Sequence, residues 1–253
     1  MPLQYVRRLT GRKRSAASNL HLGFTLAFVA GATNAGGYLA VRQYTSHMTG
    51  IVSSMADNLA LSQTGLVFDG VGALLSFLLG AACSAVMINY ARRERMHSEY
   101  ALPLLLEAGL LLCFGLLGAK MAKIEGLFVP LTVMLLCFIM GLQNALVTKL
   151  SHAEIRTTHI TGMITDIGIE LGKLFYWNRN QTGHRDVRAN RQRLRVLGSL
   201  VLCFFAGGVI GALGFKHLGY ASTVWLAVML VVLAAVPVSD DLRGAARRAR
   251  RSR

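Results

Sequence analysis

The chain has 253 residues, of which 53% are hydrophobic and only 15% are charged, and its net charge is +15. A soluble domain carries roughly 25% charged residues, so this composition excludes an ordinary water-exposed globular surface. It predicts an all-α integral membrane protein.

The basic residues gather between or outside the apolar stretches, at 7–14, 92–95, 179–195 and 243–253. Such charge in a soluble protein would point to nucleic acid. No folded recognition module accompanies it here, so we expect no nucleic-acid partner. We predict that the basic tails and loops set the topology and contact anionic lipid.

Apolar runs near or above the length needed to cross a bilayer recur along the chain. They lie at 20–41, 70–91, 102–119, 127–148, 196–215 and 221–238. Two weaker segments, 47–63 and 158–176, contain charged or amide side chains and would span, re-enter or lie at the interface. If both stay on one side and the termini are cytoplasmic, 22 Lys and Arg face the cytoplasm and four face outward. The positive-inside rule therefore favours about six transmembrane helices.

The second weak segment has two faces at helical spacing. Its charged side chains, Asp166, Glu170 and Lys173, lie opposite a stripe of Ile and Leu. This pattern predicts an amphipathic helix rather than one surrounded by lipid.

Two short motifs occur twice. Residues 45–50 (TSHMTG) match 157–162 (TTHITG), and each copy follows a span containing a related group, 31–35 (GATNA) or 141–145 (GLQNA). We interpret the chain as a tandem duplication. Each half carries three spans, so the two repeats would be inverted across the membrane, each with an additional short amphipathic or re-entrant helix.

The organisation expected from this duplication has five parts. They are a basic cytoplasmic tail (1–19), membrane repeat 1 (20–119), a connecting loop (120–126), membrane repeat 2 (127–238) and a second basic cytoplasmic tail (239–253).

At these motifs the sequence resembles the YoaK-like family of bacterial inner-membrane proteins. Its second half carries the family's pattern at 140–145 (MGLQNA), 157–162 (TTHITG) and 165–168 (TDIG). The resemblance extends over roughly residues 20–237. It departs at Asn34, where the family often has Asp, and at Ile51, where it often has Asn. The resemblance implies a multi-pass protein of the bacterial inner membrane and brings no substrate with it.

His47 and His159 are the sharpest candidates for a site because imidazole binds cations and titrates near neutral pH. Thr49 and Thr161, each followed by Gly, would let a helix N-terminus face an anionic or polar ligand. The structural alternative is that hydroxyls cap the helix and the glycines permit close packing.

Amide side chains inside spans are costly unless they find partners. Asn34, Gln143 and Asn144 would therefore either bond across helices or line a wet cavity with the histidines.

Three carboxyls complete the candidates, namely Asp57, Glu107 and Asp166. Glu107 lies inside the third span and would carry a proton or cation, or be a neutral or paired structural group. Asp57 and Asp166 would either join it or be solvated and paired with basic residues.

The leading hypothesis is a transporter or channel-like carrier of a small solute or ion, without cofactor or metal. The alternative is a membrane enzyme acting on a lipid or hydrophobic substrate, with a histidine base beside one of the carboxyls. No H-E-x-x-H, G-x-S-x-G or P-loop supports an enzyme. A third alternative is an assembly partner, a homo-oligomer included, that packs through Gly207, Gly208 and Gly211, although helix packing within the chain would explain these glycines as well.

Overall fold

A computed structural model describes residues 16–121, 128–150, 159–176 and 187–251. The described residues form helices and no strand. The helices are α2 (Ala16–Val41), α3 (Met48–Ala60), α4 (Thr64–Arg93), α5 (Ala101–Met121), α6 (Phe128–Leu150), α7 (Ile160–Phe175), α8 (Arg191–Leu218), the 3-10 turn η1 (Gly219–Ala221) and α9 (Ser222–Arg251).

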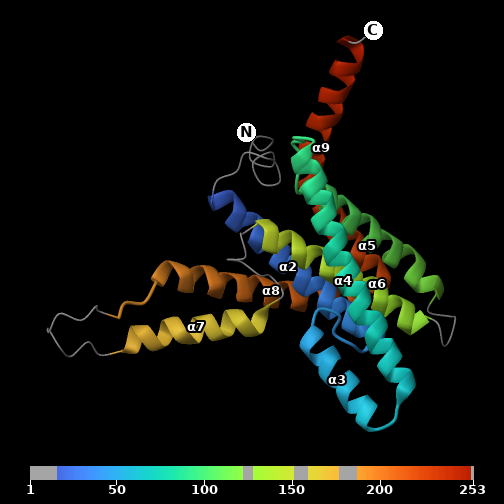
Figure 1. Ribbon diagram of the computed structural model, residues 1–253, viewed down its shortest axis with the longest axis vertical. Coiled ribbons are helices and arrows are strands. Elements are labelled where there is room, and N and C mark those ends of the chain that lie inside the picture. The colour runs from blue at the N-terminus through green and yellow to red at the C-terminus, as the bar shows by residue number, and fades with distance from the viewer. Residues whose placement is uncertain (1–15, 122–127, 151–158, 177–186, 252–253) are drawn as a thin grey trace.

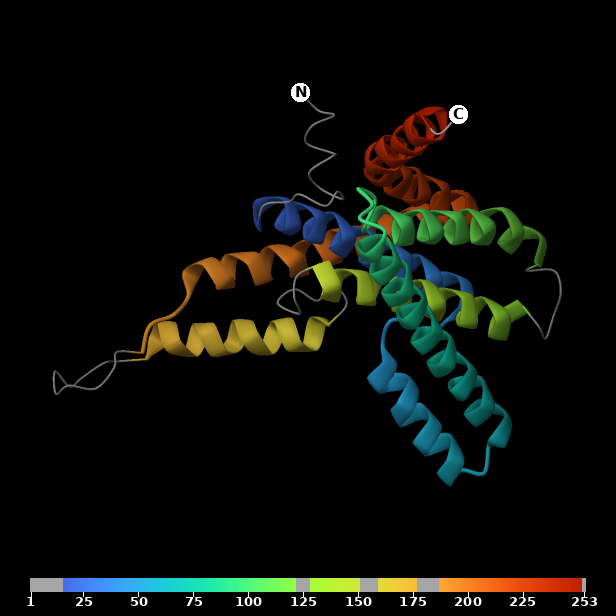
Figure 2. The same cartoon turned by 45° about the horizontal axis from the view of Figure 1, so that its top comes forward.

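Long helices form the body of the molecule, and two shorter ones project from it as arms (Figure 1). Helix α3 runs beside the first half of α4, and α7 runs beside the first half of α8. Both arms keep this arrangement in the second view (Figure 2). The last turns of α9 extend beyond the body, so the segment expected as a basic tail continues the last span as helix.

Four described stretches are long and apolar enough to cross a membrane: Ala17–Val41, Thr64–Arg93, Val129–Leu150 and Arg191–Arg243. The last is 53 residues long and contains two helices, α8 and α9. They separate at Gly219, whose φ of 59° suits glycine because it lacks a Cβ. A shorter apolar stretch, Ala101–Leu116, belongs to α5. These helices confirm the predicted membrane fold class.

Helices α2 and α6 lie at the centre of the bundle. In each, 61% of the apolar window is buried, against 28% for α4. Their leucines form much of the core, and Leu26, Leu136 and Leu146 are fully buried. The amide-bearing motifs at 31–35 and 141–145 therefore sit on the two innermost helices.

Helix α2 makes its closest crossing with α8, through two glycines. A Cβ added to Gly31 would lie 2.0 Å from the carbonyl oxygen of Phe204, and one added to Gly207 would lie 2.0 Å from that of Phe28. Because no other residue fits this distance, the two backbones touch directly, as small residues allow in membrane helices.

Helix α4 makes the same kind of crossing with α6. A Cβ on Gly80 would lie 2.0 Å from the carbonyl oxygen of Phe138, and one on Gly141 would lie 2.0 Å from that of Phe77. In each helix the phenylalanine stands three residues before the glycine. The four Phe-x-x-Gly segments thus form two reciprocal crossings, which we call the glycine crossings.

The packed helices have defined relative directions. Helices α2 and α8 are parallel, since Phe28 faces Gly207 and Gly36 faces Phe215. Helices α4 and α6 are also parallel, since Gly72 faces Met134 eight residues before the Gly80 crossing.

The remaining long pairs are antiparallel. In α2 and α6, Gln143 bonds to Leu26 while Gly37 faces Leu136. In α5 and α9, Thr223 bonds to Leu111, while Gly118, further along α5, faces Tyr220 just before α9.

Candidate functional site

Both His-x-Thr-Gly motifs lie at the start of an arm helix. His47 immediately precedes α3 and His159 immediately precedes α7. Each of these helices begins near the centre of the molecule and ends at its periphery (Figures 1 and 2). The free N–H groups of two helix N-termini are thus directed inward.

The glycine of each motif makes room for the histidine three residues before it. A Cβ on Gly162 would lie 2.4 Å from Cδ2 of His159, and a Cβ on Gly50 would lie 3.2 Å from Nδ1 of His47. Each imidazole therefore folds back over the first turn of its helix. Both histidines, like Thr49 and Thr161, are exposed.

Neither the His47 nor the His159 side chain forms a hydrogen bond or ion pair within the described residues, so neither imidazole caps its helix. The histidine–carboxylate contact that an enzyme would need is thus not made by these two residues in that part of the chain. The structure instead pairs His97 with Asp241, at 3.0 Å, where the α4–α5 connection meets α9.

Asn34 ties the first motif to α2. Its Oδ1 accepts hydrogen bonds from the backbone N–H of Ser46 at 3.3 Å and from the Ser46 hydroxyl at 3.0 Å. Helix α2 continues to Val41, so the chain must double back along it to reach Asn34. Residues 45–47 therefore re-enter the bundle before α3 begins. The matching residues 157 and 158 lie outside the described residues.

Gln143 and Asn144 occupy the corresponding part of α6. Gln143 is fully buried, and its Nε2 donates to the carbonyl oxygen of Leu26 at 3.2 Å. This is a bond between helices, as the structural alternative predicted. Its Oε1 has no partner within the described residues. Asn144 is partly exposed.

The three candidate carboxyls lie in different environments. Glu107 is fully buried in α5, and neither of its oxygens has a partner within the described residues. Asp57 is exposed on α3. Asp166 pairs with Arg193 of α8 at 3.0 Å, so its ion-pair alternative is the one observed. The structure does not bond these carboxyls to one another.

Sequence reasoning gave Glu170 no role in a site, although the structure buries it between α7 and α8. Its carboxylate accepts from Lys173 Nζ at 2.9 Å and from the backbone N–H of Asn190 at 2.7 Å. The hydrogen bond from Lys173, followed by that from Asn190, lowers the pKa of Glu170 below its ordinary value. The sequence pattern placed Glu170 in a charged stripe, but it could not show that this stripe faces α8.

Helix α7 turns its charged stripe inward and its apolar stripe outward. Glu170 is 2% exposed, whereas Ile164 is 51% and Phe175 is 81% exposed. The predicted amphipathic pattern is present, with the apolar side chains on the exposed face and the charged ones toward α8. The periodicity identified two faces correctly, but the inner one is polar.

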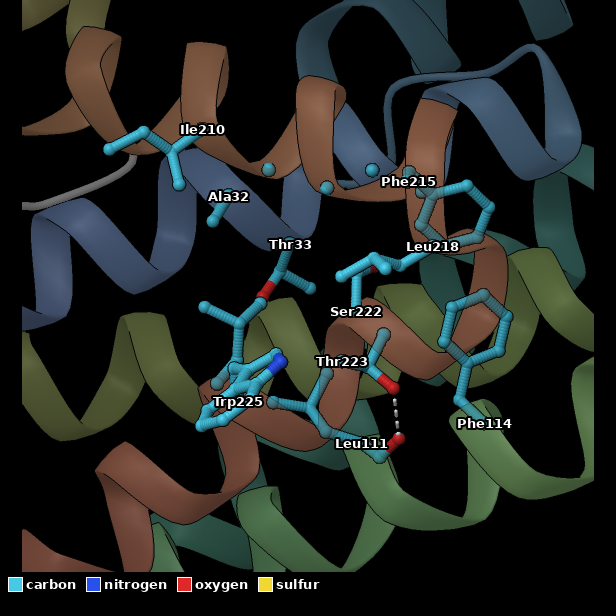
Figure 3. Close-up of a pocket in the computed structure, with 15 residues that line it drawn as sticks. Ala32, Thr33, Leu111, Phe114, Ile210, Phe215, Leu218, Ser222, Thr223 and Trp225 are labelled. Atoms are coloured by element: carbon cyan, nitrogen blue, oxygen red, sulfur yellow. Dashed lines mark hydrogen bonds between the residues drawn. The ribbon is translucent and has the colours of Figure 1, made fainter.

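An apolar pocket of about 220 Å³ lies between α2, α5, α8 and α9 (Figure 3). Thr33 and Gly36 of α2 line it, next to Asn34 in sequence, together with Phe215 and Trp225. Neither His47 nor His159 reaches it.

Two comparisons with known proteins found similar sequences. The model of a family described as "Protein of unknown function (DUF1275)" matches residues 22–236. The chain belongs to this family. The DUF1275 match spans both halves and both motifs. The chain is also 28% identical over 210 residues to the "UPF0700 transmembrane protein YoaK" of Bacillus subtilis (strain 168), covering 81% of this chain and 88% of that protein. No solved structure matches.

Membership of the DUF1275 family confirms the resemblance inferred from residues 140–145, 157–162 and 165–168. Together with the apolar helices, the transmembrane relative shows that this chain is a membrane protein. Neither comparison names a substrate.

Proposed function

We propose that this protein is a carrier of a small solute or ion in the bacterial inner membrane, with two inverted halves around a central path. The observation that carries the proposal is that two helices, α3 and α7, each start at a His-x-Thr-Gly motif near the centre of the bundle. Inverted halves with interrupted helices are a recurrent architecture of carriers.

The pairing of the helices supports two related halves. The first helix of each half crosses the second helix of the other half, α2 with α8 and α6 with α4, through the same Phe-x-x-Gly pattern. The third helices, α5 and α9, pair with each other. A twofold axis that exchanges the halves produces this set of partners.

The helix directions support six spans with inverted halves. If α3 and α7 both crossed the membrane, strict alternation would make α2 parallel to α6 and α5 parallel to α9. Both pairs are antiparallel. With α3 and α7 as re-entrant helices, all the observed directions follow, and the division of Lys and Arg favours an orientation with both termini in the cytoplasm.

The arm helices supply the chemistry for a polar solute. A helix N-terminus carries a partial positive charge and free N–H donors, which favour an anion or a hydrogen-bond acceptor. Each start also carries an imidazole that can donate, accept or take up a proton. The halves would have to open a path beside these groups, since the apolar pocket does not reach them.

Flux measurements in proteoliposomes test the proposal. Purified protein and the double variant His47→Ala with His159→Ala are assayed against a panel of small anions, neutral metabolites and cations. The wild type is expected to carry at least one solute, and the double variant to lose that flux. His217→Ala is the matched control because this exposed histidine ends α8, outside both motifs.

Equal flux through the wild type and a folded double variant would contradict a role of the motifs in transport. An absence of flux from folded wild-type protein across the whole panel would count against a carrier of these solute classes.

A further inference from the structure

The pocket in Figure 3 differs in character from the histidine-bearing helix starts. Aromatic and aliphatic groups such as Leu111, Phe114 and Phe215 dominate its wall. Its volume of about 220 Å³ is below the roughly 300–1,000 Å³ of sites that enclose a drug-sized molecule. A narrow apolar segment fits such a space better than a bulky ring system.

The hydroxyls at the wall offer little to a polar ligand. Thr223 Oγ1 donates to the carbonyl oxygen of Leu111 at 3.0 Å, as Figure 3 shows, and Ser222 Oγ donates to that of Gly219 at 2.8 Å. The Thr33 hydroxyl has no partner within the described residues, but a helical threonine can turn to the carbonyl of its preceding turn. The pocket therefore selects apolar groups.

Missing side chains create the space. Gly36 and Gly214 line the pocket from α2 and α8. A Cβ on Gly36 would lie 3.2 Å from Cδ2 of Phe215, and one on Gly214 would lie 3.2 Å from the Cβ of Ser222. Any larger side chain at these two positions would occupy the pocket.

The other half of the molecule fills the corresponding position. When the Phe-x-x-Gly segments are superposed in sequence, Gly36 corresponds to Leu146 and Gly214 corresponds to Met87. Leu146 is fully buried. The difference between the two positions thus lies in residue volumes. Residue volumes do not change when the two halves rock, so rocking would not fill this pocket and open its counterpart in the other half. The pocket is therefore distinct from a central transport path.

The rim of the pocket faces the surroundings of the protein. Trp225 is 71%, Leu218 57% and Ile210 56% exposed. On a transmembrane protein, such apolar side chains are solvated by hydrocarbon. The medium that reaches the pocket is therefore lipid, and its most abundant narrow apolar component is an acyl chain.

We propose that this pocket binds the acyl chain of a membrane phospholipid. The pocket is formed by the later parts of α2, α5 and α8 and the beginning of α9. In the proposed six-span topology these parts all lie on the outer side, so the lipid comes from the outer leaflet. The leaflet assignment rests on that topology, whereas the site itself requires no transport activity.

Photolabelling tests this site directly. The full-length protein is reconstituted in phosphatidylethanolamine and phosphatidylglycerol vesicles with a phospholipid whose acyl chain carries a diazirine near its methyl end. After illumination, peptide mapping should find adducts enriched on lining residues such as Leu111, Phe215 and Trp225.

A filling variant removes the space with residues taken from the other half. In Gly36→Leu with Gly214→Met, adducts on the lining residues should fall by about tenfold, as expected when the volume of a pocket is lost. Gly109→Leu is the matched control, because Gly109 is exposed on α5 and a Cβ there meets nothing within 4 Å. Labelling of this control should equal the wild type.

Elution volume and helical circular dichroism establish folding of each variant. If the double variant misfolds, Gly214→Met alone gives the same comparison with a smaller change. Adducts spread evenly over the outer surface, or unchanged labelling of a folded filling variant, would overturn the proposal. Loss of solute flux has no bearing on this result, so the two proposals fail separately.

Discussion

The two arms of the molecule have the same place in the fold but are held by different forces. In the first arm, α3 lies on α4 with Met55 packed over Gly70, and the connection contains Ser62 at a φ of 58°. No ion pair joins α3 to α4 in the described part of the chain. In the second arm, charged groups of α7 bond to the beginning of α8.

Equivalent positions in the two halves are therefore specified in one case by shape and in the other by charge. The first arm depends on the Met55 side chain, which fits into the space left by the missing Cβ of Gly70 on α4. The second depends on a buried carboxylate that would be costly without its partners. The two arms should therefore respond to different perturbations, although both carry a His-x-Thr-Gly start.

The largest effect on amide exchange is expected from Gly70→Val, which disturbs the packing of the first arm alone. The new Cβ would lie 2.3 Å from Cγ of Met55, so the two helices must separate or Met55 must move. Overpacking of this kind costs about 1–3 kcal/mol. Amide hydrogen exchange should accelerate in α3 and stay unchanged in α7. Gly65→Val, where a Cβ meets nothing within 4 Å, is the control on the same helix.

Acidification should loosen the second arm alone. The pKa of Glu170 is lowered in the folded state, so its contribution is complete above the ordinary value of 4.5 and is lost as the pH falls through the lowered pKa. Hydrogen exchange of α7, measured at decreasing pH below 4.5, should accelerate relative to α3. In Glu170→Gln this pH dependence should disappear. Parallel loosening of both arms would contradict the comparison.

A smaller effect separates the two motif glycines. In Gly162→Ala the new Cβ would lie 2.4 Å from the His159 ring, so the imidazole must move, whereas Gly50→Ala leaves 3.2 Å to the His47 ring. Nitrogen NMR of labelled histidines should show a clear change for His159 and a slight one for His47. Equal spectral changes for His47 and His159 would mean that positions 50 and 162 tolerate a side chain equally well.

The smallest effect is expected from Asp166→Asn. The Asp166–Arg193 pair is half-exposed, with side chains 40% and 53% accessible, and such pairs contribute about 0–1 kcal/mol. The variant should raise exchange in α7 only slightly, and high salt should abolish the difference from the wild type. Exchange in α7 accelerated as much by Asp166→Asn as by acidification of the wild type would show that this pair, and not Glu170, holds the arm.

Much of the fold could be predicted because apolar length and charge placement are one-dimensional signals. The predicted run 20–41 lies within α2, and the run 158–176 contains α7. The orientation of α7 could not be predicted, because periodicity shows that a helix has two faces without showing which one packs against the protein. Of the glycine crossings, the sequence pointed only to Gly207, which with Gly208 and Gly211 formed a possible helix-packing face, and the structure packs this face on α2. A single Phe-x-x-Gly is unremarkable in an apolar helix, and only its four related positions carry information.

The candidate site could be predicted in part. The repeated histidine motifs led to the two helix starts, and the cost of a buried amide led to the bond between Gln143 and Leu26. The role of Asn34 in holding Ser46 could not be derived, because it depends on a chain that doubles back. The acyl-chain pocket depends on four helices meeting, which no local pattern encodes.

The crosswise pairing of the helices has a consequence for biosynthesis. Helix α2 packs on α8, which begins only at Arg191, and α4 packs on α6. The long helices of the first half can therefore pack only after their partners in the second half have been synthesised. This is a high contact order, which slows folding and exposes unfinished surfaces. When only the first half has been synthesised, the glycine faces of α2 and α4 have no packing partner in the bilayer. The nascent chain then depends on lipid or an insertion chaperone to cover these faces until the second half is inserted.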